Sequence, residues 1–201
     1  MVAPGSLITI YGDGLDGAKL LLGNQVLSAI YSSNGQVNAQ VPFEVDVNAS
    51  LQLIVRNGDA LSVPEDVGVA EAQPAVFTQN QQGTGQGVIL KSDQVTLAQP
   101  GAPAEGGETV VIYCTGLGAV NPAVATGQPA PSQTLARTAS PVTVTVGGAP
   151  ANVVFAGLAP GFIGLYQINA TLDKSTPSGD AVPVIVSVAG QTSPTVTMAV
   201  R

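Results

Sequence analysis

Apolar and β-branched residues occur along this chain in short runs that are separated by polar residues, glycine and proline. In the clearest run, Val142–Val146, valine alternates strictly with threonine, which is the pattern of a strand with one face on a core and one in water. Leu7–Tyr11 and Thr109–Tyr113 are β-branched runs that end at glycine-rich turns. No segment carries apolar residues at helical spacing, and proline and glycine recur too often for a long helix. The pattern therefore predicts an all-β protein.

Two hairpins are predicted from their turn residues. The run Leu51–Arg56 is followed by Asn57-Gly58, and both of these residues tolerate the positive φ angles of a tight hairpin turn. A strand ending near Val69 would complete this hairpin. The second hairpin is expected to begin at Val182 and turn at Ala189-Gly190.

The chain repeats itself. The segment 4–15 returns as 106–117, at a constant offset of 102 positions (Pro4 to Gly106). Gln36-Val-Asn-Ala39 returns as Gln167-Ile-Asn-Ala170, at an offset of 131 positions. Leu53-Ile-Val55 returns as Val184-Ile-Val186 at that same offset. Matched blocks in one order indicate two copies of one fold, with insertions in the loops of the second copy.

Short strands, glycine and proline turns and the duplication together predict two tandem antiparallel β-sandwiches of immunoglobulin-like type. The first domain is expected over residues 1–72 and the second over 73–201, with the joint near residues 70–76. The second domain is predicted to contain an opening hairpin at 84–97 and an inserted loop at 157–165.

The opening hairpin has no counterpart in the first copy. Either that copy lacks its opening strands by truncation, or it never needed them. In both cases one sheet edge of the first domain would be unpaired, and an unpaired edge accepts strands from other segments or subunits.

Composition narrows the range of partners. The net charge is −7, and only 9 % of residues are charged, against about 25 % in a typical soluble protein. No basic surface is available for nucleic acid or for an anionic membrane. No apolar run reaches the 18 residues of a membrane-spanning helix, so we expect no membrane insertion. The first residues have neither the basic nor the apolar region of a signal peptide, so an exported protein would contain this chain as a mature or excised piece.

An ordered set of short motifs resembles a known bacterial family. Among these motifs are Ala3-Pro-Gly-Ser-Leu-Ile-Thr-Ile-Tyr-Gly12, Gln36-Val-Asn-Ala-Gln-Val-Pro-Phe-Glu44, Gly85-Gln-Gly-Val-Ile89, Ala156-Gly-Leu-Ala-Pro-Gly161 and Tyr166-Gln-Ile-Asn169. They are similar to the C-terminal domain of large exported proteins of Acidobacteria, first described in Solibacter. The resemblance covers essentially the whole chain and implies immunoglobulin-like modules of the TIG type. It implies no activity, cofactor or catalytic residue.

Candidate chemistry is sparse. The chain has no histidine, which excludes Ser-His-Asp and Cys-His pairs and nearly all zinc sites. Its one cysteine, Cys114, lies within a predicted strand and is expected to be a small buried residue rather than a nucleophile. Asp13 with Asp16, and Glu105 with Glu108, offer too few oxygens for calcium, so we predict no metal and no cofactor.

Two glycine- or amide-rich motifs are interpreted as structural. Gly83-Thr-Gly-Gln-Gly87 would need a following helix to bind phosphate, and no helical pattern follows it. The Gln-Val/Ile-Asn-Ala motif occurs in both copies, and we expect Asn38 and Asn169 to bond to backbone at a bulge or crossover.

Some aromatic residues have a counterpart in the other copy of the repeat, and others have none. Tyr11, Tyr31, Tyr113 and Phe155 lie at matched strand positions, which favours core packing. Phe162 and Tyr166 lie in or beside the 157–165 insertion, so they are the candidate ligand contacts of a binding loop.

The sequence thus favours a non-catalytic structural or assembly module of an exported or cell-surface protein. Its partners would be other domains of the same protein or neighbouring subunits, joined by strand addition as in a filament. A carbohydrate-binding or adhesin module that uses the 157–166 loop and a surface glycan is the alternative, and an enzyme is a third hypothesis that the residues favour least.

Overall fold

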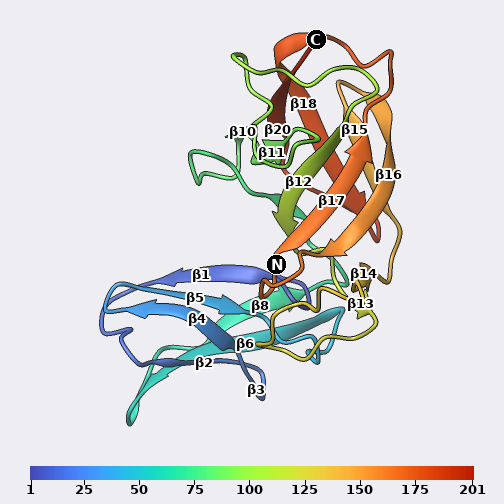
Figure 1. The fold of residues 1–201 in the computed structure, drawn as a ribbon. Helices are drawn as coiled ribbons and strands as arrows, with labels where there is room; N and C mark the ends of the chain where they lie inside the picture. The colour runs from blue at the N-terminus through green and yellow to red at the C-terminus, as the bar shows by residue number, and fades with distance from the viewer. The chain divides into compact units, whose positions relative to one another are not determined.

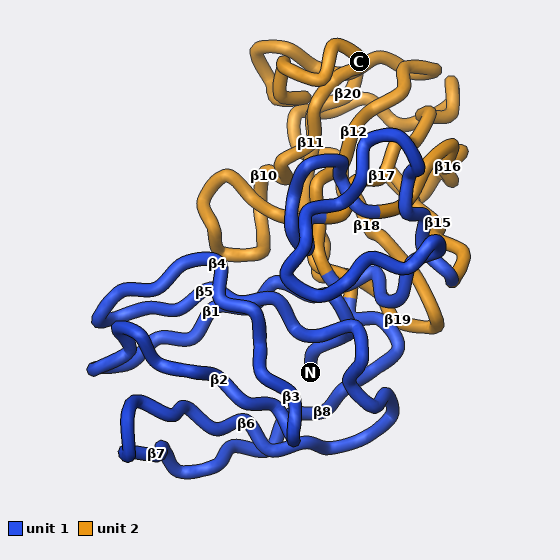
Figure 2. The backbone as a smooth tube through the Cα atoms, turned by 60° about the horizontal axis from the view of Figure 1, so that its bottom comes forward, with its two compact units in different colours: residues 1–73, 116–139, 158–165 blue, residues 74–115, 140–157, 166–201 orange.

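The computed structural model describes all residues, 1–201, and it contains strands but no helix. The all-β prediction is therefore confirmed (Figure 1). None of its elements is an apolar helix of membrane-spanning length. The chain forms two compact units, which Figure 2 distinguishes by colour. Unit 1 comprises residues 1–73, 116–139 and 158–165, and unit 2 comprises residues 74–115, 140–157 and 166–201.

Unit 1 contains two sheets. The first has the order β1–β5–β4, and the second has the order β3–β2–β6–β7 with β8 also paired to β6. Their bounds are β1 (Leu7–Tyr11), β2 (Lys19–Leu22), β3 (Gln25–Val26), β4 (Ser28–Ser33), β5 (Gln36–Gln40), β6 (Ala49–Asn57), β7 (Ala60–Leu61) and β8 (Glu65–Val69). A short pair, β13 (Val120–Asn121) with β14 (Arg137–Thr138), also lies in this unit.

The core of unit 1 draws on both sheets. Leu20 and Leu22 of β2 and Val37 and Ala39 of β5 belong to one buried apolar cluster. Because successive side chains of a strand alternate between its faces, Lys19 of β2 is exposed while Leu20 is buried. The apolar faces of the two sheets therefore share one core.

Residues 116–139 and 158–165 are the additional material of the second copy, yet they cluster with the first seventy-three residues. The buried Gln40 accepts a hydrogen bond at Oε1 from the backbone N–H of Gly127, at 2.8 Å. Thr126 Oγ1 accepts the N–H of Phe43 at 3.0 Å and donates to a carboxylate oxygen of Glu44 at 2.7 Å. These bonds fix the first inserted segment to unit 1, a connection that the predicted division at residue 72 does not contain.

Unit 2 has the strand order β10–β20–β18–β15–β16–β17–β12–β11, with β9 also paired to β12 and β19 to β18. The bounds are β9 (Ala75–Val76), β10 (Gly85–Gln86), β11 (Ile89–Leu90), β12 (Thr109–Thr115), β15 (Val142–Val146), β16 (Ala149–Leu158), β17 (Tyr166–Thr171), β18 (Gly179–Val188), β19 (Gln191–Thr192) and β20 (Val196–Val200). The alternating run 142–146 is strand β15, and its three valines are buried.

Strand pairing follows the sequence repeat residue by residue. In β1 and β5, Thr9 lies opposite Asn38, and in β12 and β17, Val111 lies opposite Asn169. The matched hairpins of the two copies share one serine contact. Ser62 Oγ in the first and Ser193 Oγ in the second each accept a hydrogen bond from a backbone N–H at 3.0 Å. The duplicated sequence therefore encodes the same register twice.

Two features differ from the predictions. The expected antiparallel sheets include one parallel pair, in which β10 runs beside β20 because it arrives from a distant part of the chain. The prediction of core packing is wrong for Tyr11 and Tyr31, whose side chains are 74 % and 51 % exposed. Both lie on the solvent side of their strands, so their apolar rings do not contribute to the core.

Candidate functional site

One strand of unit 1 has a free side. Strand β1 pairs with β5, and no strand lies on its other side. Its counterpart in unit 2, β12, pairs with β17 on one side and with β11 and β9 on the other. The unpaired edge expected from the sequence is therefore present in unit 1 and can be followed at β1 in Figure 1.

The difference extends to individual backbone groups. In unit 2 the N–H of Tyr113 donates to the carbonyl of Val88 at 3.2 Å, and its own carbonyl accepts the N–H of Phe77 at 3.0 Å. No such bonds engage the equivalent residue, Tyr11. Because the direction of N–H and C=O groups alternates along a strand, the backbone of Thr9 points to the same free side. Thr9 and Tyr11, whose backbone groups point outward, thus offer hydrogen-bond donors and acceptors to another strand.

An apolar groove of about 310 Å³ adjoins this edge. Its lining combines the chain start, β1, and facing positions of the second sheet, namely Met1, Val2, Ile8, Thr9, Ile10, Leu22, Leu53 and Val67. Ile8, Ile10, Leu53 and Val67 are only half-buried. Their counterparts Val110, Ile112, Val184 and Met198 are fully buried in unit 2. The groove is therefore core-like surface that unit 1 leaves uncovered.

The two candidate ligand contacts of the 157–166 loop differ in their exposure to solvent. Phe162 is 57 % exposed and lies in unit 1, where its carbonyl accepts the N–H of Ala130 at 2.9 Å. Tyr166 is fully buried in β17 of unit 2, opposite Cys114. The expectation that Tyr166 contacts a surface ligand is corrected, because its ring packs inside the core.

Cys114 is fully buried in β12, between Val76 of β9 and Tyr166 of β17. Burial in apolar surroundings raises the pKa of its thiol far above the ordinary value, so the nucleophilic thiolate is disfavoured. The structure places this residue in the core of unit 2, as the strand pattern predicts.

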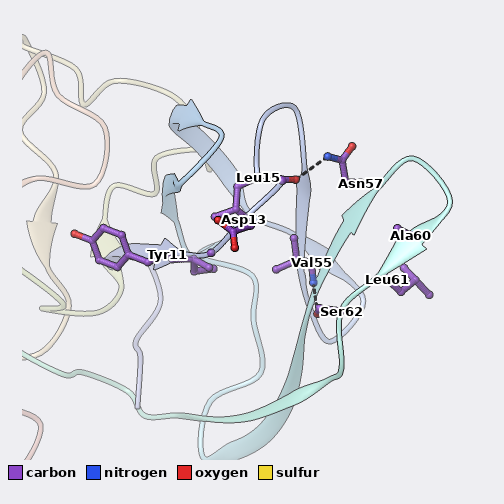
Figure 3. Close-up of a pocket in the computed structure, with 11 residues that line it drawn as sticks. Tyr11, Asp13, Leu15, Val55, Asn57, Ala60, Leu61 and Ser62 are labelled. Carbon is purple, nitrogen blue, oxygen red and sulfur yellow. Dashed lines mark hydrogen bonds between the residues drawn. The ribbon is translucent and has the colours of Figure 1, made fainter.

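A second hollow lies at the far end of β1. It has a volume of about 520 Å³, and Figure 3 shows the side chains that line it. Asn57 Nδ2 donates to the carbonyl of Gly14 at 2.7 Å, which ties the hairpin to the Asp13–Asp16 turn. The Tyr11 ring points away from Asn57 and Leu61 (Figure 3), so it offers no aromatic platform in this hollow.

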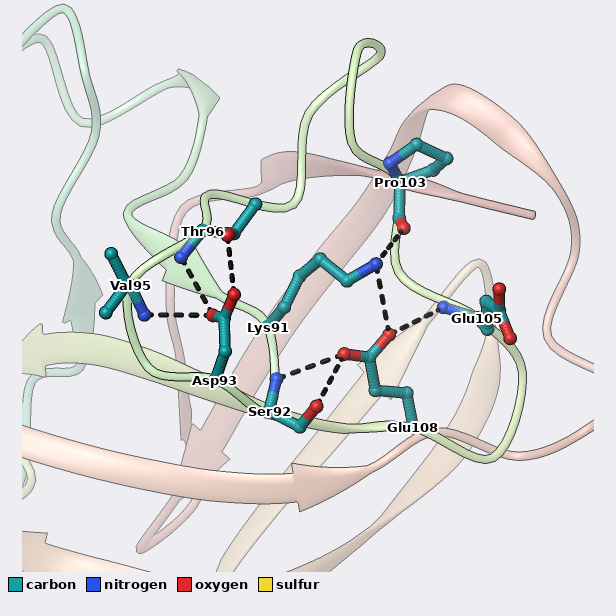
Figure 4. A network of polar contacts seen from close by, with 8 residues as sticks. All are labelled: Lys91, Ser92, Asp93, Val95, Thr96, Pro103, Glu105 and Glu108. Carbon is teal, nitrogen blue, oxygen red and sulfur yellow. Dashed lines mark hydrogen bonds and ion pairs between the residues drawn. The ribbon is translucent and has the colours of Figure 1, made fainter.

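The Glu105–Glu108 turn is held by one carboxylate (Figure 4). Glu108 accepts the N–H and hydroxyl of Ser92 and the N–H of Glu105, each at 3.0 Å, and Lys91 Nζ lies 3.7 Å away. Partial burial is the largest single influence and raises the pKa of Glu108, but the hydrogen bonds and Lys91 together lower it below its ordinary value. Glu108 thus joins two turns, and no group of three potential metal-ligating residues occurs in the structure.

The remaining motifs have structural positions. No helix follows Gly83–Gly87, and a Cβ atom on Gly87 would lie 3.0 Å from Ile89 and 3.1 Å from Val196. The expectation that Asn38 and Asn169 bond to backbone is wrong. Their Oδ1 atoms accept instead from the side-chain amides of Gln36 at 2.7 Å and Gln167 at 2.8 Å. Residues two apart share one face of a strand, which brings each Gln and Asn together.

Sequence reasoning predicted the open edge but missed the groove behind it. Ile8, Ile10, Leu53 and Val67 look like ordinary core positions, and their matched residues in the second copy are core. The signal available in the sequence was the opening hairpin of the second copy, which contains Ile89 and has no counterpart among the matched residues of the first copy.

The chain matches no protein-family model and no curated protein. Among solved structures it resembles two surface glycan-binding proteins. The one from Prevotella bryantii is 14 % identical over 96 % of this chain and 36 % of its own, with a TM-score of 0.34. That of Bacteroides ovatus, in complex with a mixed-linkage heptasaccharide, is 13 % identical over 100 % of this chain and 44 % of its own, with a TM-score of 0.44.

The chain also resembles the titin immunoglobulin tandem A164–A165, at 9 % identity over 100 % of this chain and 91 % of that one, with a TM-score of 0.27. It spans less than half the length of each glycan-binding protein. At these identities and TM-scores the likenesses transfer neither a site nor a function to the chain.

Proposed function

We propose that this chain is a non-catalytic structural module of an exported or cell-surface protein, and that it joins neighbouring segments by strand addition at β1. In this proposal each unit is an immunoglobulin-like β-sandwich, and the chain is a member of the acidobacterial C-terminal domain family that its motifs resemble. The neighbouring segment is another domain of the same protein or another subunit.

The observation that carries the proposal is the contrast between β1 and β12. The same strand of a duplicated fold has partners on both sides in unit 2 and on one side in unit 1. An open edge beside half-buried apolar side chains favours pairing with another strand, because main-chain hydrogen bonds and apolar burial act together there. The lack of histidine and the burial of Cys114 support a non-catalytic role.

In-cell photocrosslinking tests the proposal. A photoreactive amino acid replaces Thr9, whose side chain is exposed on β1, in the full-length gene product. We expect crosslinks to one discrete extended segment, identified by mass spectrometry of the joined peptides.

The matched control carries the same amino acid at Gln52, an exposed position of β6. It is expected to give no such product, since β6 already pairs with β2 and β8. An absence of crosslinks at position 9, or equal crosslinks from both positions, would contradict strand addition at β1.

Carbohydrate binding through the 157–166 loop is a second candidate, favoured by one observation. Phe162 is the exposed aromatic residue of that loop, and backbone bonds of Ala130 to Phe162 and Gly161 hold its turn. An exposed, fixed aromatic ring suits stacking on a sugar. A glycan array signal that Phe162→Ala abolishes would support this function, whereas an array without signal would exclude it for the glycans presented.

A further inference from the structure

We infer that the apolar groove of unit 1 accepts an extended donor strand with a glycine followed two residues later by a large aliphatic side chain. This inference rests on the proposed strand addition and specifies its partner. Unit 2 supplies the argument, because it contains the same groove with its occupant in place.

The occupant in unit 2 crosses between two sheet edges. Gly85 and Gln86 run parallel to β20, opposite Val196 and Thr197. Three residues after Gln86 the chain pairs with β12, where Ile89 lies opposite Ile112. At the equivalent places in unit 1, β8 begins with Glu65 and Asp66, and β1 contains Ile10. A donor strand is therefore expected to run along β8 first and then along β1.

The crossing point favours glycine. A Cβ atom on Gly87 would approach both the Ile89 side chain and Val196 within 3.1 Å, closer than neighbouring atoms tolerate without shifting. Ile89 itself is fully buried and lies opposite Ile112, the counterpart of the groove residue Ile10. The steric demand and the buried side chain together define the pattern Gly-x-Ile for the donor.

Charge adds a preference at the first contact. The counterparts of Val196 and Thr197 in unit 1 are the exposed carboxylates Glu65 and Asp66. A basic side chain at the donor position equivalent to Gln86, which lies opposite Thr197 in unit 2, would share a face of the sheet with the carboxylate of Asp66. Such a charge pair is favourable at low ionic strength and is screened by salt.

The donor is a segment other than residues 83–98 of a second copy. In unit 2 that segment already buries Ile89 and donates the N–H of Gly87 to Thr197 at 2.8 Å, so donation between copies would first break these contacts. The donor in this inference is therefore a separate extended segment that contains the pattern Gly-x-aliphatic.

Peptide titration of the purified chain tests this inference. The probe is a synthetic peptide with the sequence of residues 83–98, and calorimetry measures its affinity. We expect saturable binding with one peptide per chain, weakened about tenfold or more by Ile89→Asp in the peptide, because that change places a carboxylate in the apolar groove. Gln86→Lys in the peptide should tighten binding at low salt, and the gain should vanish at high salt.

Variants of the protein locate the binding site. Thr9→Pro removes an outward N–H of an edge strand and should weaken peptide binding about tenfold, while Gln25→Ala, at an exposed position of β3 outside the groove lining, should leave affinity unchanged. Hydrogen exchange of the wild-type chain supplies a readout that needs no variant. Peptide binding is expected to protect residues 7–11 and 65–69 and to leave β12 and β20 unchanged.

Three results would overturn the inference: no peptide binding, equal binding of the wild-type and Ile89→Asp peptides, or protection in β12 and β20. A concentration-dependent dimer of the free chain that is protected at residues 7–11 would identify a second copy as the occupant and would also overturn it. If crosslinks form at position 9 while the peptide fails to bind, strand addition stands and only the assigned donor pattern fails.

Discussion

At the scale of single residues, polar side chains in this protein mostly hold turns. Asp93 illustrates this, because its carboxylate accepts the hydroxyl of Thr96 at 2.5 Å, the N–H of Thr96 at 2.8 Å and the N–H of Val95 at 3.0 Å (Figure 4). The hydroxyl of Thr96, followed by the two backbone N–H groups, lowers the pKa of Asp93 from 3.8 to about 2. The carboxylate of Asp93 is thus engaged by the backbone and hydroxyl of its own turn.

Asp93→Asn should reduce the acid dependence of stability. The folded-state pKa is lowered, so the carboxylate stabilises the fold above pH 3.8, and this contribution is lost as the pH falls toward 2. Urea unfolding between pH 5 and pH 2 should show a smaller loss of midpoint for Asp93→Asn than for wild type. Thr96→Val removes the principal donor and should act in the same direction, and an unchanged pH profile in both variants would contradict this assignment.

At the scale of elements, the duplication lets one hydrogen bond be compared in two environments. Ser62 Oγ accepts the N–H of Val55 and Ser193 Oγ accepts the N–H of Val186, both at 3.0 Å. Ser193 is buried, whereas Ser62 is exposed. The registers match because the apolar pattern and the turn positions match, although the surroundings of the two serines differ in burial.

Ser193→Ala should therefore destabilise more than Ser62→Ala. Truncating Ser193 leaves a buried N–H without its acceptor, which costs about 1–3 kcal/mol. The same change at Ser62 exposes the N–H to water and should cost about 0.5 kcal/mol or less. Chemical unfolding of the two variants measures both values, and equal losses would show that burial does not separate the two hairpins.

At the scale of the whole molecule, the order of segments along the chain differs from their grouping in space. The segment 116–139 lies between strands β12 and β15 of unit 2 in the chain, but it clusters with residues 1–73. Gln40 carries part of this connection, because its buried side chain bonds to Gly127.

Gln40→Ala should loosen unit 1 together with the 116–139 segment. Native-state hydrogen exchange should show faster opening of β5 and of residues 116–139, with a loss of about 1–3 kcal/mol, while β18 and β20 keep their protection. Gln52→Ala, at an exposed position of β6, is the matched control and should change little. Opening of 116–139 together with β12 and β15 would contradict the grouping into unit 1.

The all-β class, the duplication and the hairpins could be predicted from the sequence. These follow from alternation and turn residues, which are local or repeated signals. The prediction of core packing for Tyr11 and Tyr31 is wrong, because matched strand positions in two copies do not by themselves show which face of the strand is buried. Two features follow from tertiary packing alone. The insertion 116–139 joins unit 1, and a groove is lined by Ile8, Ile10, Leu53 and Val67. Burial depends on what packs against a residue, and no pattern within a strand records the presence or absence of that neighbour.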